Sequence, residues 1–394
     1  MNYSGINMSD VRTKNKSIVL KLLNDSGDMS RKDISETLGL TPAAVSILTA
    51  ELIEEGFVRE SGKESDSDSS KAGRKKIKLT LCTDRFYAVS INVEKDNTCV
   101  SLVRLDGELI SMRKVPTLEN GKKSLTIAAE SASEIIAESG VDEDSILGAG
   151  LGLVGSYDRK NDLILRFGLW ENDFHPAEFL SRALNMNVEA ENNVKAFAGA
   201  HMLFSKEQSK NLLFIKWSEG IGSAIIFDGK TVPGAQEIGH YITEHNSRIC
   251  RCGRKGCIET VCTIESIAES VMTVYSAETT PILFSLTKGD ASKIKEQIQV
   301  CDISAIDDAA KAVILNRINL MARAAVNAAT TMTPEKIILF GSMWSKSIFS
   351  LFVMECRKLA AFYKTDIIFK SGIMDKEDYI GPISLVSRAK FFLE

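Results

Sequence analysis

The chain has 394 residues, of which 44% are hydrophobic and 25% charged, with a formal net charge of −4. This length exceeds what one hydrophobic core supports, so we expect two or three globular domains. The sequence contains no run of 18 apolar residues, so we expect no membrane span. The N-terminus lacks the apolar centre of a secretory signal. Together these two features indicate a cytoplasmic protein. The weak acidity excludes a protein whose whole surface coats nucleic acid.

The segment 17–39 predicts two short helices. Apolar and basic residues alternate at helical spacing from Ser17 to Leu23, just before a turn-forming run at 24–27. Ser30, with Asp33 three residues later, forms a capping box. Gly39 suits the C-terminal end of the helix that this box starts.

A third helix is predicted between Thr41, an N-cap residue, and Gly56, with Pro42 at the first helical position. Two helices joined by about three residues around a glycine make a helix-turn-helix, whose second helix lies in the major groove of DNA. The buried stripe of this second helix is expected to be Val45, Leu48 and Leu52. The residues expected to face base edges are small or carry a hydroxyl group: Thr41, Ala43, Ala44, Ser46 and Thr49.

Two predicted strands, Phe57–Val58 and Ile77–Leu81, form a wing around a segment rich in Ser, Asp and Glu. Five of the eight residues from Lys71 to Lys78 are basic and none is acidic. We expect an arginine of the wing tip to enter a minor groove and two lysines to contact phosphate; these residues are Arg74, Lys75 and Lys76. An alternative is a helical dimerisation module with a solvated basic loop. The capped helices, the glycine between them and the basic wing together favour DNA binding.

Four of the eight cysteines fall within 13 residues, a density typical of a metal site in a reducing compartment. Three thiolates and one imidazole fill a tetrahedral shell and leave no position for water, so we expect structural Zn²⁺. The thiolates of this shell are Cys250, Cys252 and Cys257. Spacing alone leaves His240 and His245 as candidate imidazoles and Cys262 as a competing thiol.

The motif Glu-x-Gly-His at 237–240, followed by Cys-x-Cys-Gly-x-x-Gly-Cys-x-Glu at 250–259, resembles the signature of the ROK family of sugar kinases and sugar-responsive repressors. The resemblance extends over essentially the whole chain. The N-terminal winged helix is similar to that of the family's xylose- and N-acetylglucosamine-type repressors. The family pattern implies His240 as the fourth zinc ligand.

The resemblance implies an α/β fold of two subdomains of the actin-like ATPase (sugar-kinase-like) type behind the winged helix-turn-helix. We expect the DNA-binding domain at 1–82 and the sensor domain at 83–394. Subdomain one would comprise about 83–198 plus a C-terminal helix at 376–394, and subdomain two about 199–375 with the zinc motif. Hairpins predicted at 86–105 and 211–228, and strands predicted at 146–154 and 336–340, agree with this fold.

In the family, an Asn-Asp pair and the Glu and His residues of the signature hold sugar hydroxyls. The matching residues here are Asn192, Asn193, Glu237, His240 and Glu259. Carboxylates and amides each take adjacent hydroxyls, which suits a polyol. One nitrogen of His240 on zinc and the other on a hydroxyl would couple the metal to the pocket. An alternative role for Glu237 and Glu259 is support around the zinc.

The resemblance also implies a kinase ancestry, but the residues of phosphoryl transfer have changed. Asn193 stands where the family has its Asp general base, and an amide cannot take a proton at neutral pH. The family loops Asp-x-Gly-Gly-Thr and Gly-Thr-Gly-Ile-Gly correspond to 92–96 and 218–222 here. Three carboxylates in these loops would repel a polyphosphate: Glu94, Asp96 and Glu219. We therefore expect no catalysis.

Other departures touch the sugar site itself. Lys195 replaces a common Asn, Val154 replaces a proline, and the loop 232–236 is shortened. They predict either an unusual sugar or a pocket that has lost its ligand.

The sequence thus predicts a repressor of carbohydrate-use genes whose affinity for operator DNA is modulated by a sugar or sugar derivative in a catalytically inactive cleft. A homodimer or a dimer of dimers is expected, because helix-turn-helix proteins usually bind two half-sites. The helix predicted at 309–331 is either a subunit surface or a buried interdomain helix. Alternatives are a ROK-type sugar kinase with an appended DNA-binding domain, and a repressor controlled by a protein partner.

Overall fold

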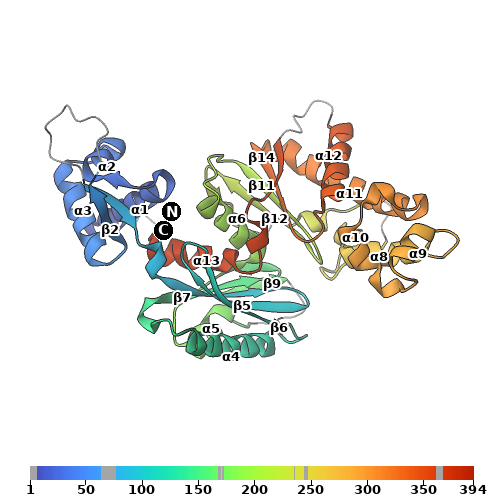
Figure 1. Ribbon diagram of the computed structural model, residues 1–394, viewed down its shortest axis with the longest axis horizontal. Helices are drawn as coiled ribbons and strands as arrows, with labels where there is room; N and C mark the ends of the chain where they lie inside the picture. The colour runs from blue at the N-terminus through green and yellow to red at the C-terminus, as the bar shows by residue number, and fades with distance from the viewer. Residues whose placement is uncertain are drawn as a thin grey trace.

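The computed structural model describes residues 7–63, 77–166, 170, 173–234, 236–243, 247–360 and 367–394. The chain forms a small N-terminal winged helix and a larger body of two α/β lobes (Figure 1). The C-terminus returns to lie beside the N-terminal domain. Among the described residues, no helix is long and apolar enough to cross a membrane.

The winged helix contains three helices and a three-stranded antiparallel sheet of order β1-β3-β2. The helices are α1 (Met8–Ser26), α2 (Arg31–Leu38) and α3 (Pro42–Glu54), and the strands are β1 (Met29–Ser30), β2 (Val58–Lys63) and β3 (Ile77–Leu81). The predicted capping residues are confirmed. Ser30 and Asp33 form a capping box, Thr41 Oγ1 accepts from Ala44 N at 3.2 Å, and Gly39 is left-handed with φ +64°.

Lobe one is built on a five-stranded sheet of order β10-β7-β4-β5-β6, parallel from β10 to β4 and antiparallel beyond. Its strands are β4 (Tyr87–Val93), β5 (Asn97–Arg104), β6 (Leu109–Pro116), β7 (Ile146–Leu153) and β10 (Val188–Asn192). Helices α4 (Gly121–Ser139) and α5 (Pro176–Leu184) lie together on this lobe, α4 against β5 and β6 and α5 against β10. Strands β8 (Ser156–Asp158) and β9 (Leu163–Arg166) form a separate pair.

The chain's last helix, α13 (Ile380–Val386), packs on β4, β7 and β10 of lobe one. The approach is close at Gly150, where an added Cβ would lie 1.9 Å from the carbonyl oxygen of Pro382. Only glycine fits at this position. The C-terminal segment is therefore a structural part of lobe one, far from it in sequence.

Lobe two has a second five-stranded sheet, of order β13-β12-β11-β14-β15. Its strands are β11 (Leu212–Trp217), β12 (Ile221–Phe227), β13 (Lys230–Thr231), β14 (Lys336–Phe340) and β15 (Ile368–Lys370). Its helices are α7 (Glu259–Cys262), α8 (Ile264–Met272), α9 (Pro281–Leu286), α10 (Ile294–Val300), α11 (Asp308–Met332) and α12 (Lys346–Leu359). The predicted helix 309–331 is α11, and its buried stripe belongs to the core of this lobe. The helix therefore lies within lobe two and not between domains, and its other face carries exposed residues.

Helix α6 (Asn193–Phe204) joins the two lobes. It packs against α13 and β7 of lobe one and against β11 and β12 of lobe two. Phe197 of α6 stacks on Phe340 of β14, with ring centroids 4.0 Å apart. Apolar residues of both lobes and of the winged helix form one hydrophobic cluster around this helix.

The winged helix is attached to the body through the C-terminal segment. Phe391 is fully buried, with its ring centroid 5.0 Å from that of Phe57 and 5.9 Å from that of Phe86. Lys21 Nζ lies 3.2 Å from Glu394 Oε1, an ion pair between α1 and the last residue of the chain. A motion of the C-terminal segment would therefore change the position of the DNA-binding domain directly.

Candidate functional site

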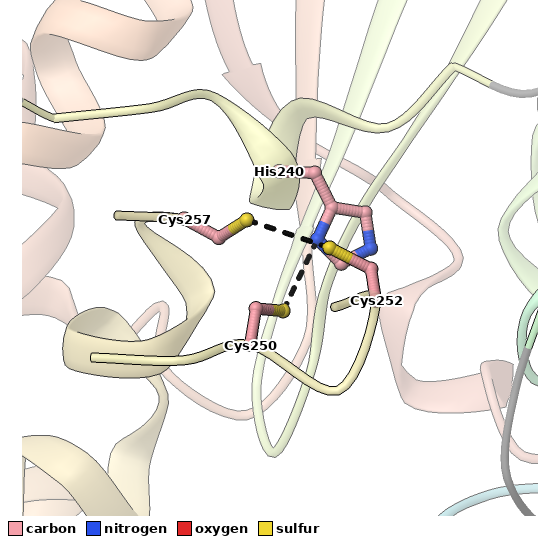
Figure 2. Close-up of side chains that lie close together, drawn as sticks. All are labelled: His240, Cys250, Cys252 and Cys257. Atoms are coloured by element: carbon pink, nitrogen blue, oxygen red, sulfur yellow. Dashed lines mark hydrogen bonds between the residues drawn. The ribbon is translucent and has the colours of Figure 1, made fainter. Parts of the chain in front are cut away.

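Three cysteines and one histidine converge on a single point (Figure 2). Their possible ligand atoms all lie within 4.8 Å of one another. Cys250 Sγ is 3.5 Å from His240 Nδ1, and Cys252 Sγ is 3.6 Å from Cys257 Sγ. Two sulfurs on a tetrahedral zinc lie about 3.8 Å apart, given Zn–S bonds of about 2.3 Å. The donor set and its spacing therefore fit a structural metal ion, and the site leaves no place for a water ligand.

The local backbone explains why the cluster forms. Gly253 and Gly256 have φ of +83° and +87°, and the chain doubles back so that Cys250 N donates to Arg254 O at 2.8 Å. Burial raises the pKa of the Cys257 thiol to about 12. Burial also acts on Cys252, but hydrogen bonds from the backbone and side chain of Arg254 outweigh it and lower the pKa of this thiol to about 6. A bound cation would supply the charge that stabilises the remaining thiolates.

The competing thiol of Cys262 is not part of this cluster. It is buried at the end of α7, and its Sγ lies 3.7 Å from the carbonyl oxygen of Arg317. His245, the competing imidazole, lies outside the described residues.

A cavity of about 360 Å³ opens between the lobes beside the metal cluster. This volume lies within the range of small-molecule pockets. All five residues expected to bind sugar line it: Asn192, Asn193, Glu237, His240 and Glu259. The structure thus brings together residues from β10, α6 and α7 and from the loop that carries the metal motif.

Asn192 caps α6 and shapes the wall of the cavity. Its Oδ1 accepts from Val194 N and Lys195 N, at 3.0 and 3.2 Å, and its Nδ2 donates to Gly155 O at 2.8 Å. Only one amide hydrogen remains for a ligand. The side chain of Lys195 is buried and its Nζ donates to Gly234 O, so this lysine connects the first turn of α6 to the loop 232–234.

The two pocket carboxylates have separate partners. Glu237 Oε1 accepts from Ser156 Oγ at 2.7 Å, and its Oε2 lies 3.8 Å from His240 Nε2. Because His240 Nδ1 faces the sulfurs, its two nitrogens face the metal cluster and the cavity respectively. Glu259 Oε2 accepts from Ile221 N at 3.1 Å, and burial raises the pKa of this carboxyl. Each carboxylate therefore has a structural contact and a position on the cavity wall.

The floor of the cavity carries an ion pair that sequence reasoning missed. Lys216 Nζ of β11 lies 2.5 Å from Glu94 Oε1 at the end of β4, so the pair joins the two lobes. The same oxygen accepts from Asn193 Nδ2 at 2.8 Å. Burial disfavours the ammonium form of Lys216, but the charges of Glu94 and Glu377 outweigh it and raise its pKa. A lysine in the otherwise apolar strand 212–217 was the available signal.

Glu219, in the loop that matches the family's second phosphate loop, belongs to a cluster of three carboxylates. Carboxylate oxygens of Asp96, Glu219 and Glu265 lie within 4.8 Å of one another. Burial, followed by the charge of Asp96, raises the pKa of Glu219. Lys295 Nζ lies 2.6 Å from Glu265 and 3.3 Å from Glu219, and offsets part of this charge. A polyphosphate would meet like charge here.

The predicted DNA-contacting residues fall into three groups. Thr41, Ala43 and Ser46 are exposed on α3 and Ala44 is half-buried, as a base-facing surface requires. The prediction for Thr49 is wrong, because its side chain is 0% exposed. Its Oγ1 donates to Val45 O at 2.8 Å and accepts from Arg31 Nε at 3.0 Å. The predicted wing-tip contacts lie outside the described residues: Arg74, Lys75 and Lys76.

Comparison with known proteins gives a consistent result. The ROK family model matches residues 88–388, and a winged helix-turn-helix DNA-binding model matches residues 12–59. The DNA-binding transcriptional dual regulator NagC of Escherichia coli is 23% identical over 97% of this chain and 94% of its own. The xylose repressor of Caldicellulosiruptor bescii is 25% identical over 94% of this chain and 95% of its own.

Solved structures agree on the fold. A ROK family transcriptional regulator, a homologue of the E. coli Mlc protein, superposes with a TM-score of 0.79 at 20% identity and covers 97% of both chains. A ROK family glucokinase from Streptomyces griseus superposes with a TM-score of 0.64 at 18% identity and covers 77% of this chain and 99% of its own. The part shared with the kinase is the body, and the part shared with the regulator includes the winged helix. The chain belongs to the ROK family, as a member with an N-terminal winged helix-turn-helix domain.

Proposed function

We propose that this protein is a transcriptional repressor of carbohydrate-use genes, with operator DNA and a sugar or sugar derivative as its two ligands. One observation carries the proposal: the winged helix is attached to a ROK body in which Glu94, in the stretch that matches the family's first phosphate loop, is paired with Lys216 on the cavity wall. The proposed domains are 1–82 for DNA and 83–394 for the effector. The protein would act in the cytoplasm as a homodimer or a dimer of dimers.

The cavity supports a sugar as the effector. Its polar groups are amides, carboxylates and an imidazole, which suit the alternating hydroxyls of a polyol. The contacts proposed for the sugar are Asn193, Glu237, His240 and Glu259, with Asn192 as the capping residue that positions α6. The relatives are named for N-acetylglucosamine and xylose, which makes these two sugars the first candidates.

The metal ion is proposed to be Zn²⁺ with a structural role. Three thiolates and one imidazole are soft and borderline ligands that suit zinc, and a closed shell has no open position for catalysis. When bound, the ion would fix the ring of His240 and thereby the orientation of its Nε2 toward Glu237.

Loss of phosphoryl transfer is also a proposal. A general base must accept the proton of the attacking hydroxyl, but the Asn193 amide donates a hydrogen bond to Glu94 instead. Glu219, Asp96 and Glu265 would repel the nucleotide phosphates. The alternative of a sugar kinase with an added DNA-binding domain requires turnover despite both changes.

A contiguous set of packed elements connects the two proposed ligands. The cavity is walled by the first turn of α6, α6 packs on α13, and α13 leads to Phe391 and Glu394, which contact the winged helix. A sugar that closes the lobes around α6 would move the C-terminal segment and so re-orient the DNA-binding domains of a dimer. This works only if the sugar binds the two conformations with different affinities.

The test is fluorescence anisotropy of labelled DNA from the gene's own upstream region, titrated with protein at fixed salt with and without a sugar panel. Fixed salt is needed because phosphate contacts make the affinity strongly salt-dependent. Specific binding that one sugar relieves supports the repressor and identifies its inducer. Tight binding that no sugar changes favours the alternative in which a protein partner controls the repressor. Absence of specific binding contradicts the proposal.

A further inference from the structure

We propose that α3 recognises its operator chiefly through the C5-methyl groups of thymine, with Ile47 as the principal contact. The inference rests on the proposed DNA-binding function and adds the chemistry by which bases are distinguished. It starts from an exposed apolar side chain in a place where helix-turn-helix proteins usually present polar ones.

Ile47 is 58% exposed, although it stands in the N-terminal half of the helix that the fold assigns to the major groove. Its exposed neighbours on α3 are Ala43, Ser46 and Ala50. The opposite stripe, formed by Val45, Leu48 and Leu52, is buried against the rest of the domain. In the first half of α3 the exposed stripe is therefore mostly methyl groups, and its acidic residue, Glu54, lies at the C-terminal end of the helix.

The hydroxyl groups of α3 are already engaged. Thr41 Oγ1 accepts the capping bond from Ala44 N, and Ser46 Oγ donates to Pro42 O at 2.8 Å. Thr49 is buried and bonded to Val45 O. Thr41 can still donate its hydroxyl hydrogen and Ser46 can still accept a hydrogen bond, but α3 carries no amide, ammonium or guanidinium group for the usual bidentate contacts to a base.

The residue types on α3 lead to the same conclusion. Guanine is usually read by Arg or Lys and adenine by Asn or Gln, and the α3 sequence contains none of these four residue types. Arg31 of α2 reaches α3, but its Nε is held by Thr49 at 3.0 Å and its Nη1 by Glu60 at 3.1 Å. The acidic Glu51 at the other end of α3 is paired with Arg12 and Lys16 of α1.

The thymine C5-methyl group is the apolar feature that distinguishes base pairs in the major groove. A short aliphatic side chain that lies in the groove buries its own surface only where such a methyl group meets it. One buried methyl group is worth about a fourfold change in a binding constant. Several such contacts per half-site would give useful discrimination without any polar contact from α3.

The experiment uses the full-length protein and a duplex obtained by in vitro selection from a random library. Each thymine of the selected site is then replaced singly by deoxyuridine, which removes the methyl group and leaves the base pairing intact. We expect one or two positions per half-site at which the dissociation constant rises about fourfold. Ile47→Ala should weaken binding to the thymine site about tenfold and remove the difference between thymine and uracil at one of these positions.

Two further variants make the result specific. Val11→Ala alters another exposed apolar residue of the same domain, 42% exposed on α1, and should leave the thymine–uracil difference unchanged. Ile47→Arg should shift the selected base at the contacted position toward guanine. Circular dichroism of each variant shows whether the domain is folded.

The outcomes separate this inference from the proposed function. If no sequence is enriched, the proposed operator binding is itself wrong. If a site is enriched but every uracil replacement is neutral, or Ile47→Ala keeps the full thymine–uracil difference, DNA binding stands and the thymine contact is overturned.

Discussion

Asn193 Nδ2 donates a hydrogen bond of 2.8 Å to Glu94 Oε1, and this contact joins two of the positions at which the sequence departs from the kinase pattern of the family. The amide stands where a base would accept a proton, and the carboxylate stands where a phosphate-binding loop would offer backbone N–H groups. The two changes are complementary, because an amide can donate to a carboxylate and a second carboxylate cannot. The two side chains stabilise each other, which supports the proposal that the cleft does not catalyse phosphoryl transfer.

Restoring the acid should therefore not restore a kinase. Asn193→Asp would place two carboxylates in contact beside a single ammonium group, so we expect no sugar-dependent ATP hydrolysis. We also expect a loss of roughly 1–2 kcal/mol in stability at pH 8. The loss should shrink at pH 5, because protonation of one carboxyl relieves the repulsion. Thermal unfolding at the two pH values measures this, and measurable turnover by the variant would contradict the inactive cleft.

Local signals in the sequence were sufficient for the capped helices and for the close spacing of three cysteines. Ser30 and Thr41 cap within three residues of themselves, and the cysteines at 250–257 lie on one loop. The choice of His240 over His245 and the fold of the body came from the family resemblance. The ion pair of Lys216 with Glu94 joins residues 122 positions apart, and no local pattern indicates it. Such contacts depend on how two lobes meet, which the sequence of either lobe does not specify.

The error at Thr49 has a simple cause. Thr49 follows Val45 by four residues and precedes Leu52 by three, so helical periodicity places it on the buried stripe. A hydroxyl group does not require exposure, because a buried threonine can bond the carbonyl four residues earlier, as Thr49 does here. The same periodicity places Ile47 on the exposed face, which a hydrophobicity criterion alone would assign to the core.

A second prediction concerns Glu377, whose charge interacts with that of Lys216. Burial raises the pKa of this carboxyl to about 7, and its Oε2 is buried without a hydrogen-bond donor among the described residues. A group whose folded pKa lies above its unfolded value loses stability as pH rises between the two. Glu377→Gln should therefore be more stable than the native protein at pH 8, by up to roughly 3 kcal/mol, and similar to it near pH 5.

Denaturant unfolding of both proteins at the two pH values gives the comparison. Asp378→Asn is the matched control, because Asp378 forms a partly exposed ion pair with Lys114 at 2.7 Å and should change stability by less than about 1 kcal/mol. An equal effect of Glu377→Gln at both pH values would show that the carboxyl is ionised throughout.

The metal cluster makes a third prediction. The native protein should contain one equivalent of zinc, and Cys252→Ser should release it and lower the midpoint of thermal unfolding, because metal binding contributes directly to folding. Cys262→Ser is the control: this thiol is buried in the core of lobe two and faces Arg317 O, so the variant should keep its zinc. Elemental analysis of the purified proteins distinguishes the two. Stoichiometric zinc in Cys252→Ser would remove that cysteine from the ligand set.

The last prediction tests the connection between the cavity and the winged helix. Phe391 is fully buried between Phe57 and Phe86, and Phe391→Ala should cost about 3–5 kcal/mol, as large aromatic deletions do. The helices and strands of the winged helix also pack on one another, α1 and α2 on α3 and α1 on β3, so we expect the domain to keep binding DNA. If the proposed connection is right, the sugar should no longer change the anisotropy of labelled DNA, because Phe391→Ala removes the contact between the C-terminal segment and the winged helix.

Two variants separate this effect from a general loss of stability. Phe391→Leu retains most of the apolar contact and should keep part of the response to sugar. Phe369→Ala removes a half-exposed ring from β15, at the far edge of lobe two, and should leave the response intact. If Phe391→Ala binds sugar and DNA and the sugar still weakens DNA binding as in the native protein, the signal travels by another route. Loss of the response with both ligands still bound would locate the coupling in the C-terminal segment.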